Sequence, residues 1–365
     1  MELIERARLS LAKGDAAAAH AQLLQALKAC QTVGDRAGGA AVLHELAYQA
    51  RLRGDLPAAE PLLRQAIQLR LAVNDQAGWV ESVYELGMLE RARGQVTLAT
   101  DMLSRALYTA RQLDNRPLIA RCLHQMGVMS AQAQEYEPAE TLFNEALEVQ
   151  QSGGGDPAGQ STTLHELGAL REAVGDLFAA ADYYKRSLTL CEAGGNLPGQ
   201  VANLSSLGAI YQARSRTGEA ERYYSRALDL ARRSGQPAVL AEMQHNLGTA
   251  LYARQDYAGA FDQLWQSHCL VPDSDAADWM RALYTALGPE PFLTQAKRLG
   301  VDSALLTSVV HGDAPTAPAQ EMTMARLVAL RLRVGKGEFL KLAEQSQIPP
   351  TVVAKVEDAA KSLGG

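Results

Sequence analysis

The chain has 365 residues, enough by length alone for two or three globular domains. Its formal charge of -6 at pH 7 argues against general affinity for nucleic acids or anionic membranes. No run reaches the roughly 18 consecutive apolar residues that a membrane-spanning helix needs, and the acidic start from Met1 to Arg6 has no signal-peptide pattern. We therefore expect a cytoplasmic protein with no membrane contact.

One alanine recurs at intervals of 40 or 41 residues through most of the chain. Its copies are Ala19, Ala59, Ala99, Ala139, Ala180, Ala220 and Ala260. Sequence periods of this length are typical of solenoids, in which each unit packs only on its neighbours. The spacing predicts seven copies of one unit over residues 1–270.

Each unit has two helical patterns separated by a turn. In the second copy, Leu43, Leu46 and Ala47 lie on one helical stripe, and a second stripe begins at Ala59. The pair Gly54-Asp55 between them is a turn signal. Each unit is therefore predicted to be a hairpin of a first and a second helix.

Small residues recur in the middle of the first helix, at Ala7, Ala47, Gly87, Gly127, Gly168, Gly208 and Gly248. Glycine in a helix costs about 1 kcal/mol relative to alanine, so a neighbouring helix is expected to approach closely here. We expect the recurring alanine of the second helix to make this contact. Larger residues fill the gaps, at Leu23, Leu63, Leu103, Phe143, Tyr184, Tyr224 and Leu264.

The repeat contains Leu-Gly pairs at 86–87, 167–168, 207–208 and 247–248, and Gly-Asp turns at 14–15, 54–55 and 175–176. This pattern resembles the tetratricopeptide repeat, whose usual length is 34 residues. The longer form found here is similar to repeats of kinesin light chains, Leu-Gly-Asn-repeat polarity scaffolds and bacterial peptide-sensing regulators. The resemblance implies an all-α, right-handed superhelical solenoid of helical hairpins.

The repeat pattern fades after Leu264-Trp265. Residues 275–287 read as an amphipathic helix, and 289–299 and 302–310 as short helices. We predict four parts: the solenoid over 1–270, capping helices over 271–310 that cover its last apolar face, a linker over 311–319, and a small helical tail over 320–365.

The tail has a net charge of +2 and a spacing that resembles the helix-turn-helix core of phage-repressor-type regulators. The core positions would be Ala343, Ile348, Val353 and Val356. Gln347 replaces the usual turn glycine, Pro349-Pro350 opens the second helix, and Lys355 is the one plausible base contact. The tail is thus either a DNA-binding element or a small capping or dimerisation element.

Four histidines share one position of the first helix, namely His44, His124, His165 and His245, with Tyr84 and Ser205 completing the row. Successive hairpins lie about 8–10 Å apart, whereas zinc needs its nitrogen ligands at about 2 Å. A metal site is therefore not predicted, although His124 and His165 are adjacent. Ligand contacts and plain packing remain the alternatives.

In tetratricopeptide proteins this row, with the residues three before it and four and seven after it, lines the concave face. The resemblance therefore implies a partner-binding groove lined by His44, Tyr48, Arg51, Glu81, Tyr84, Met88, Arg91, Arg121, His124, Thr162, His165, Glu172, Ser205, Gln212, Glu242, His245, Thr249 and Tyr252. This mixture suits a peptide, because it offers hydrogen-bonding groups for backbone and apolar pockets for side chains. The lysine and asparagine of the chaperone-binding carboxylate clamp are missing.

No catalytic, cofactor or metal motif is found. Residues 154–161 nearly match a phosphate loop, but Gln160 replaces the lysine and no strand precedes it. The four cysteines have no CxxC spacing, which is typical of buried thiols in a reducing compartment. We expect a non-enzymatic scaffold that binds a peptide or helix of a partner protein. The alternative is a transcriptional regulator that binds DNA through residues 320–365.

Overall fold

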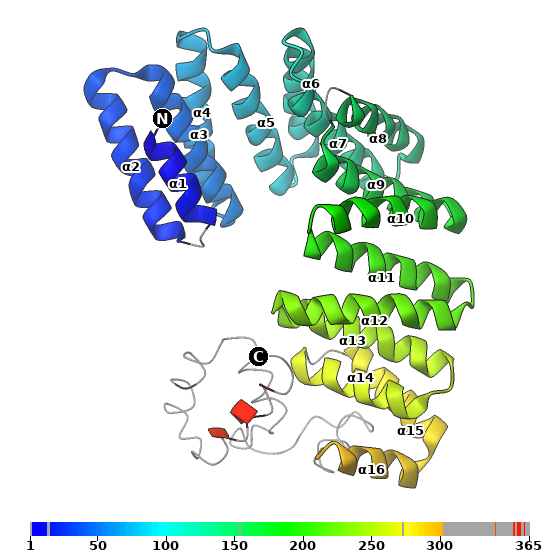
Figure 1. Ribbon diagram of the computed structural model, residues 1–365. Coiled ribbons are helices and arrows are strands. Elements are labelled where there is room, and N and C mark those ends of the chain that lie inside the picture. The colour runs from blue at the N-terminus through cyan, green and yellow to red at the C-terminus, as the bar shows by residue number, and fades with distance from the viewer. Residues whose placement is uncertain are drawn as a thin grey trace. The chain divides into compact units, whose positions relative to one another are not determined.

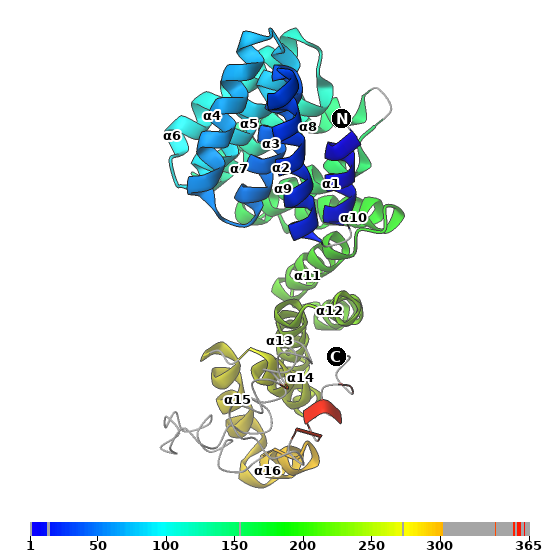
Figure 2. The same cartoon turned by 90° about the vertical axis from the view of Figure 1, so that its left-hand side faces the viewer.

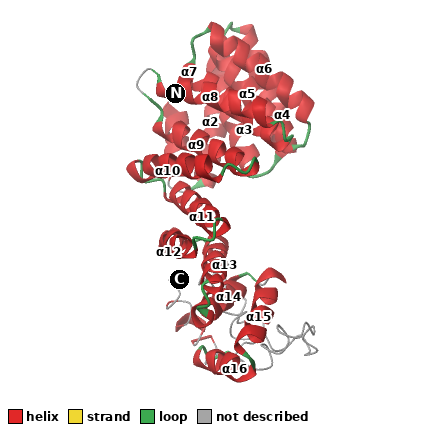
Figure 3. Cartoon of the chain, turned by 90° about the vertical axis from the view of Figure 1, so that its right-hand side faces the viewer, coloured by secondary structure: helices red, strands yellow, loops and turns green. Residues whose placement is uncertain are grey.

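The computed structural model describes residues 2–12, 15–152, 155–271 and 274–301, with Leu340, 353–354, 356–358 and Lys361. All elements in the described part of the chain are α-helices (Figure 1; Figure 3). None of these helices is long and apolar enough to cross a lipid bilayer. The predicted helix at 302–310, the linker and nearly all of the tail lie outside the described residues.

The chain divides into two compact units, residues 1–170 and 171–365. The helices of the first unit are α1 (Glu2–Ala12), α2 (Ala16–Val33), α3 (Arg36–Leu52), α4 (Leu56–Ala72), α5 (Gln76–Ala92), α6 (Val96–Gln112), α7 (Arg116–Gln132), α8 (Tyr136–Gln151) and most of α9 (Pro157–Ala173). Those of the second unit are α10 (Leu177–Ala193), α11 (Leu197–Ala213), α12 (Thr217–Ser234), α13 (Pro237–Ala253), α14 (Tyr257–Leu270), α15 (Ser274–Leu287) and α16 (Pro289–Arg298).

The helices up to α14 follow the predicted order of seven two-helix repeats, in which odd labels are first helices and even labels are second helices. Helices α3 to α7 are each 17 residues long, and three-residue connections complete the period. The one-residue insertion falls in the connection 152–156 after α8. The 40-residue period therefore reflects long helices rather than long loops.

The predicted Gly-Asp turns end one helix and cap the next. Gly54 has a φ of +78°, a left-handed conformation that terminates α3 without steric cost. The Asp55 carboxylate then accepts the backbone N–H of Ala58 at 3.2 Å and caps α4. Asp75 caps α5 in the same way through Gly78, at 2.9 Å. At these turns, sequence signals at the end of one helix and the start of the next explain the sharp hairpin.

The glycines of the first helices do permit close packing, but not against the alanine row. A Cβ atom on Gly127 would lie 2.7 Å from the Phe143 ring, and one on Gly208 would lie 2.5 Å from the Tyr224 ring. The glycine is therefore contacted by the large residue four positions after the recurring alanine. The expectation that the alanine itself makes this contact was wrong. The alanines, such as Ala139, are fully buried nearby.

Helices α15 and α16 pack on the last hairpin of the second unit (Figure 2). Trp279 of α15 meets the Tyr252 ring edge-on at 5.2 Å, and Phe292 of α16 meets the Phe261 ring at 4.9 Å. Leu283 is fully buried in this contact region. These two helices match the predicted segments 275–287 and 289–299.

Candidate functional site

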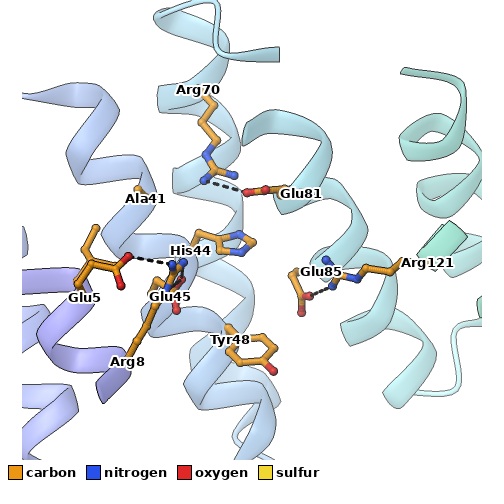
Figure 4. A pocket seen from close by; sticks show the side chains of 11 residues that line it. Glu5, Arg8, Ala41, His44, Glu45, Tyr48, Arg70, Glu81, Glu85 and Arg121 are labelled. Carbon is orange, nitrogen blue, oxygen red and sulfur yellow. Dashed lines mark hydrogen bonds and ion pairs between the residues drawn. The ribbon is translucent and has the colours of Figure 1, made fainter. Parts of the chain in front are cut away.

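The first helices of four successive hairpins form a pocket of about 480 Å³ in the first unit (Figure 4). All but one of its lining residues come from α1, α3, α5 and α7, and the exception comes from α4. They are Ile4, Glu5, Arg8, Ala41, His44, Glu45, Tyr48, Arg70, Glu81, Glu85 and Arg121. The structure thus brings together four residues of the predicted groove, namely His44, Tyr48, Glu81 and Arg121.

A buried carboxylate joins three hairpins at this pocket. The Glu85 side chain is only 4% exposed, and its two oxygens bind different arginines. Arg51 of α3 lies 2.9 Å from Oε2, and Arg121 of α7 lies 3.1 Å from Oε1. The Arg121 guanidinium also lies 4.2 Å from the centre of the Tyr84 ring. These charge-assisted and cation–π contacts hold the four side chains together.

Arg70 reaches the pocket from the second helix α4 and is 5% exposed. Its Nη1 donates to Ser82 Oγ at 2.9 Å and to the Gly78 carbonyl. The carboxylates of Asp75 and Glu81 lie 3.7 and 3.8 Å away. Burial lowers the pKa of Arg70, and the two acids oppose that shift. Arg70 therefore supplies a positive charge deep in the pocket wall.

At the outer edge of the pocket, Arg8 of α1 lies between two glutamates (Figure 4). It makes an ion pair with Glu45 of α3 and lies 3.3 Å from Glu5 of its own helix. The pocket therefore carries four carboxylates and three guanidinium groups, mostly paired with one another.

Two histidines of the predicted row link adjacent hairpins. His44 Nδ1 lies 3.2 Å from Ser82 Oγ, and His124 Nδ1 lies 3.1 Å from Thr163 Oγ1. Burial, with the charges of nearby arginines, lowers the pKa of His44 to about 3 and that of His124 to about 4. Both rings are therefore neutral near pH 7, and His124 also packs on Phe143 at 5.6 Å.

The remaining predicted residues of the first unit do not line the pocket. Tyr84 and Met88 are buried, Arg91 and His165 are partly buried, and Thr162 is exposed with its hydroxyl on the Ala158 carbonyl. Within the described residues, no group of three or more His, Cys, Asp or Glu side chains could hold a metal ion.

In the second unit the same positions carry mostly neutral contacts. Ser205 accepts from Asn246 Nδ2 at 3.2 Å, and Gln212 Nε2 lies 3.5 Å from Thr249 Oγ1. Tyr252 packs on the rings of Tyr257 and Trp279. Of the other predicted residues, Glu172 accepts from the Tyr184 hydroxyl at 2.9 Å, Glu242 is exposed and His245 is partly buried.

Sequence reasoning missed the row that directly follows the histidine row. It reads Glu45, Glu85, Gln125 and Glu166 in the first unit and Ser206 and Asn246 in the second. Arg70 was also missed, although its row holds small or neutral residues elsewhere, at Cys30, Ala110, Gln150, Cys191 and Ala231. One arginine in a row of small or neutral residues was the signal that could have revealed it.

Comparison with known proteins agrees with this repeat architecture. A sequence model described as tetratricopeptide repeat matches residues 79–152, 159–233 and 200–268, which is half of the chain. No curated protein matches the chain in sequence.

Solved structures of other proteins share the fold. The apo form of the quorum sensor NprR from B. thuringiensis has 14% identity and a TM-score of 0.54, covering 95% of this chain and 86% of that one. Pseudomonas aeruginosa pilF has 20% identity and a TM-score of 0.53, covering 68% and 99%. BtubC from P. vanneervenii has 20% identity and a TM-score of 0.52, covering 58% and 89%. Since the repeat model covers half of the sequence and the helices form consecutive hairpins, the chain belongs to the tetratricopeptide repeat family.

Proposed function

We propose that the first unit binds a peptide or helical segment of a partner protein in the pocket between α1, α3, α5 and α7. The observation that carries this proposal is the convergence of first-helix side chains from four hairpins on one cavity of about 480 Å³. A cavity of this size lies within the range of small-ligand sites, roughly 300–1,000 Å³, and accommodates a few side chains of a peptide.

The chemistry of the pocket suits a polypeptide. Glu81 and Arg121 have half-exposed side chains, at 50% and 51%, and both remain available to a ligand. The partly exposed Tyr48 adds a ring and a hydroxyl. Donors, acceptors and an aromatic face together can hold a peptide backbone and its side chains. Because the charges are already paired, binding would need little rearrangement of the pocket.

We infer that the role is binding rather than catalysis, and that the protein works in the cytoplasm. All four cysteines are free, and burial raises the pKa of the Cys122 and Cys269 thiols to about 12, which makes them poor nucleophiles. One similar structure is described as a quorum sensor, and a sensor must bind its signal. This description supports a binding role for the shared fold without naming a ligand for this chain.

The proposal can be tested with peptides selected from a random phage-displayed library on the full chain. Synthetic versions of the selected peptides would be titrated by fluorescence anisotropy against the wild type and the variant Tyr48→Ala/Glu81→Gln/Arg121→Gln. We expect at least a tenfold weaker affinity for this variant, about 1.4 kcal/mol or more. His124 is left unchanged, because its bond to Thr163 and its packing on Phe143 contribute to the fold.

The matched control is Tyr108→Ala/Glu145→Gln/Arg105→Gln, which changes the same residue types on the second helices α6 and α8. All three control side chains are exposed or partly exposed. Circular dichroism would verify that both triple variants keep the fold. Equal binding by the wild type and the pocket variant, or a loss confined to the control, would overturn the proposal.

The alternative function is DNA binding through residues 320–365, which rests on the helix-turn-helix-like spacing from Ala343 to Val356. Most of this segment lies outside the described residues. A gel-shift titration at two salt concentrations would test it, because phosphate contacts make DNA binding strongly salt-dependent. Binding that is lost on removing residues 320–365 would support this function, and no binding at low salt would exclude it.

A further inference from the structure

The second unit carries an arginine whose guanidinium lies over an exposed aromatic ring. Phe178, near the start of α10, is 72% exposed. The guanidinium carbon of Arg214, just after α11, lies 3.8 Å from the centre of the Phe178 ring. Arginine commonly stacks on aromatic faces, and this contact leaves N–H groups at the edge of the guanidinium able to donate. The partly exposed Arg214 is therefore a preorganised hydrogen-bond donor.

More cations gather on the aromatic pair beside it. Tyr211 of α11 and Tyr223 of α12 stack at 5.2 Å with their planes 13° apart. Lys185 lies 5.7 Å and Arg216 lies 5.3 Å from the Tyr211 ring. A hydrogen bond from Lys185 is the largest cause of a lowered pKa at the Tyr211 hydroxyl, and the charge of Arg216 contributes. The cluster thus creates a local positive potential.

Two of these cations have no acidic partner in the described part of the chain. Among the described residues, neither Lys185 nor Arg214 has a carboxylate within ion-pair distance, whereas Arg216 pairs with Glu219. Arg186, the residue after Lys185 on α10, is by contrast paired with Asp182 at 3.9 Å. The cluster therefore has an uncompensated charge of about +2 in a chain whose formal charge is -6.

We propose that the cluster of Phe178, Lys185, Arg214 and Arg216, with the Tyr211–Tyr223 stack beside it, is a docking surface for an acidic segment of a partner protein. Charge complementarity selects the partner, because unpaired cations in an acidic protein attract carboxylates. Arginine and aromatic residues are also enriched among the residues that dominate binding energy at interfaces. The planar edge of Arg214 matches a carboxylate in two-point geometry.

The test uses the full chain and a fluorescein-labelled peptide of about twenty residues that alternates glutamate with glycine. Anisotropy titrations would compare the wild type with Lys185→Gln/Arg214→Gln. The matched control, Arg186→Gln/Arg232→Gln, removes the same net charge from paired arginines of α10 and α12. We expect about fivefold weaker binding for the cluster variant, as the loss of two exposed charge contacts implies, and less than twofold for the control.

A third variant, Phe178→Ala, keeps every charge and removes only the ring beneath Arg214. It should also weaken binding, because Arg214 loses its fixed position, while circular dichroism stays unchanged. Equal losses of peptide affinity in the cluster and control variants would overturn the proposal, since the peptide would then be attracted by any positive charge on the surface. The proposal would also be overturned if duplex DNA displaced the labelled peptide at a lower concentration than unlabelled peptide does. A dimer of the chain that the cluster variant abolishes would overturn it as well.

Discussion

The first and second units use the same repeat position for different chemistry. In the first unit Glu85 is buried between Arg51 and Arg121, which belong to the two neighbouring hairpins. At the equivalent position in the second unit, Asn246 donates to Ser205 of the preceding hairpin. At this repeat position both units link neighbouring hairpins, and only the first unit does so with an ion pair. The repeat determines the position of each side chain, and the residue type at that position determines which contacts the side chain can make.

The packing beneath these surfaces is the same in both units. Gly127 faces the Phe143 ring in the first unit, and Gly208 faces the Tyr224 ring in the second. The difference between the units therefore comes from the side chains at this repeat position and not from the scaffold. Substitutions at charged positions should therefore change the free energy of unfolding by different amounts in the two units. Substitutions at packing positions should change it by similar amounts.

The largest effect is expected for Glu85→Gln. This change keeps the shape but leaves two arginines without their carboxylate, and breaking a buried ion pair typically costs about 3–5 kcal/mol. Because Arg121 is half-exposed, we expect the low end, about 3 kcal/mol, from urea unfolding. The matched change in the second unit is Glu221→Gln, which breaks a partly exposed pair with Arg254 and should cost below about 1 kcal/mol. Equal losses in the free energy of unfolding would show that the charged link in the first unit is not stronger than the pair in the second.

The neutral histidines of the first unit predict a pH effect. Unfolded histidine titrates near pH 6.5, while the folded pKa values of His44 and His124 are about 3 and about 4. Between those limits the unfolded chain binds more protons, so the free energy of unfolding falls as the pH drops. From pH 7 to pH 5.5 the loss should be about 1 kcal/mol per histidine.

The variant His44→Asn/His124→Asn isolates this effect, since asparagine can bond to Ser82 and Thr163 without titrating. Its loss of stability between pH 7 and pH 5.5 should be smaller than that of the wild type by about 2 kcal/mol. Parallel pH profiles for the two proteins would show that the histidine rings are not held neutral.

A packing substitution should affect both units alike. Gly127→Ala and Gly208→Ala each force a Cβ atom into an aromatic ring, and overpacking of this kind costs about 1–3 kcal/mol. We expect about 1.5 kcal/mol in each unit by thermal or urea unfolding. Gly218→Ala in α12 is the control, because open space surrounds that position and alanine favours a helix. A stabilising effect at all three glycines would contradict the close helix contact.

The smallest effect concerns a helix cap. Asp176→Ala removes the acceptor for the Ala179 N–H at the start of α10 and should cost about 1 kcal/mol. Asp182→Ala, on the exposed face of the same helix, should change stability by less than about 0.5 kcal/mol. If the two changes had the same cost in urea unfolding, the turn aspartates would not act as caps.

The sequence was sufficient for the hairpins, because the 40-residue period, the Gly-Asp turns and the helical stripes all agree. It was not sufficient for the contact at the glycines. Gly127 and Ala139 are both small, so they were expected to meet, whereas the side chain that fills the space is Phe143. Spacing identifies which residues face inward, but the packing of real side-chain volumes decides which of them touch.

The pocket was predicted only in part. His44, Tyr48, Glu81 and Arg121 follow from the family pattern, while Arg70 lies on a second helix that the pattern does not include. Its position in the pocket wall is explained by its hydrogen bonds to Ser82 and to the Gly78 carbonyl. Ion pairs between hairpins depend on how far each side chain extends toward the next hairpin. The spacing of residues along the sequence does not give this distance.

We propose that the first unit binds a peptide between its first helices. Photo-cross-linking tests it most directly, with a selected peptide that carries a benzophenone group and the full chain as target. We expect adducts on α1, α3 and α5, at or beside Arg8, Tyr48 and Glu81, and their loss in the Tyr48→Ala/Glu81→Gln/Arg121→Gln variant. Adducts confined to residues 171–301, or to α2 and α6, would contradict it.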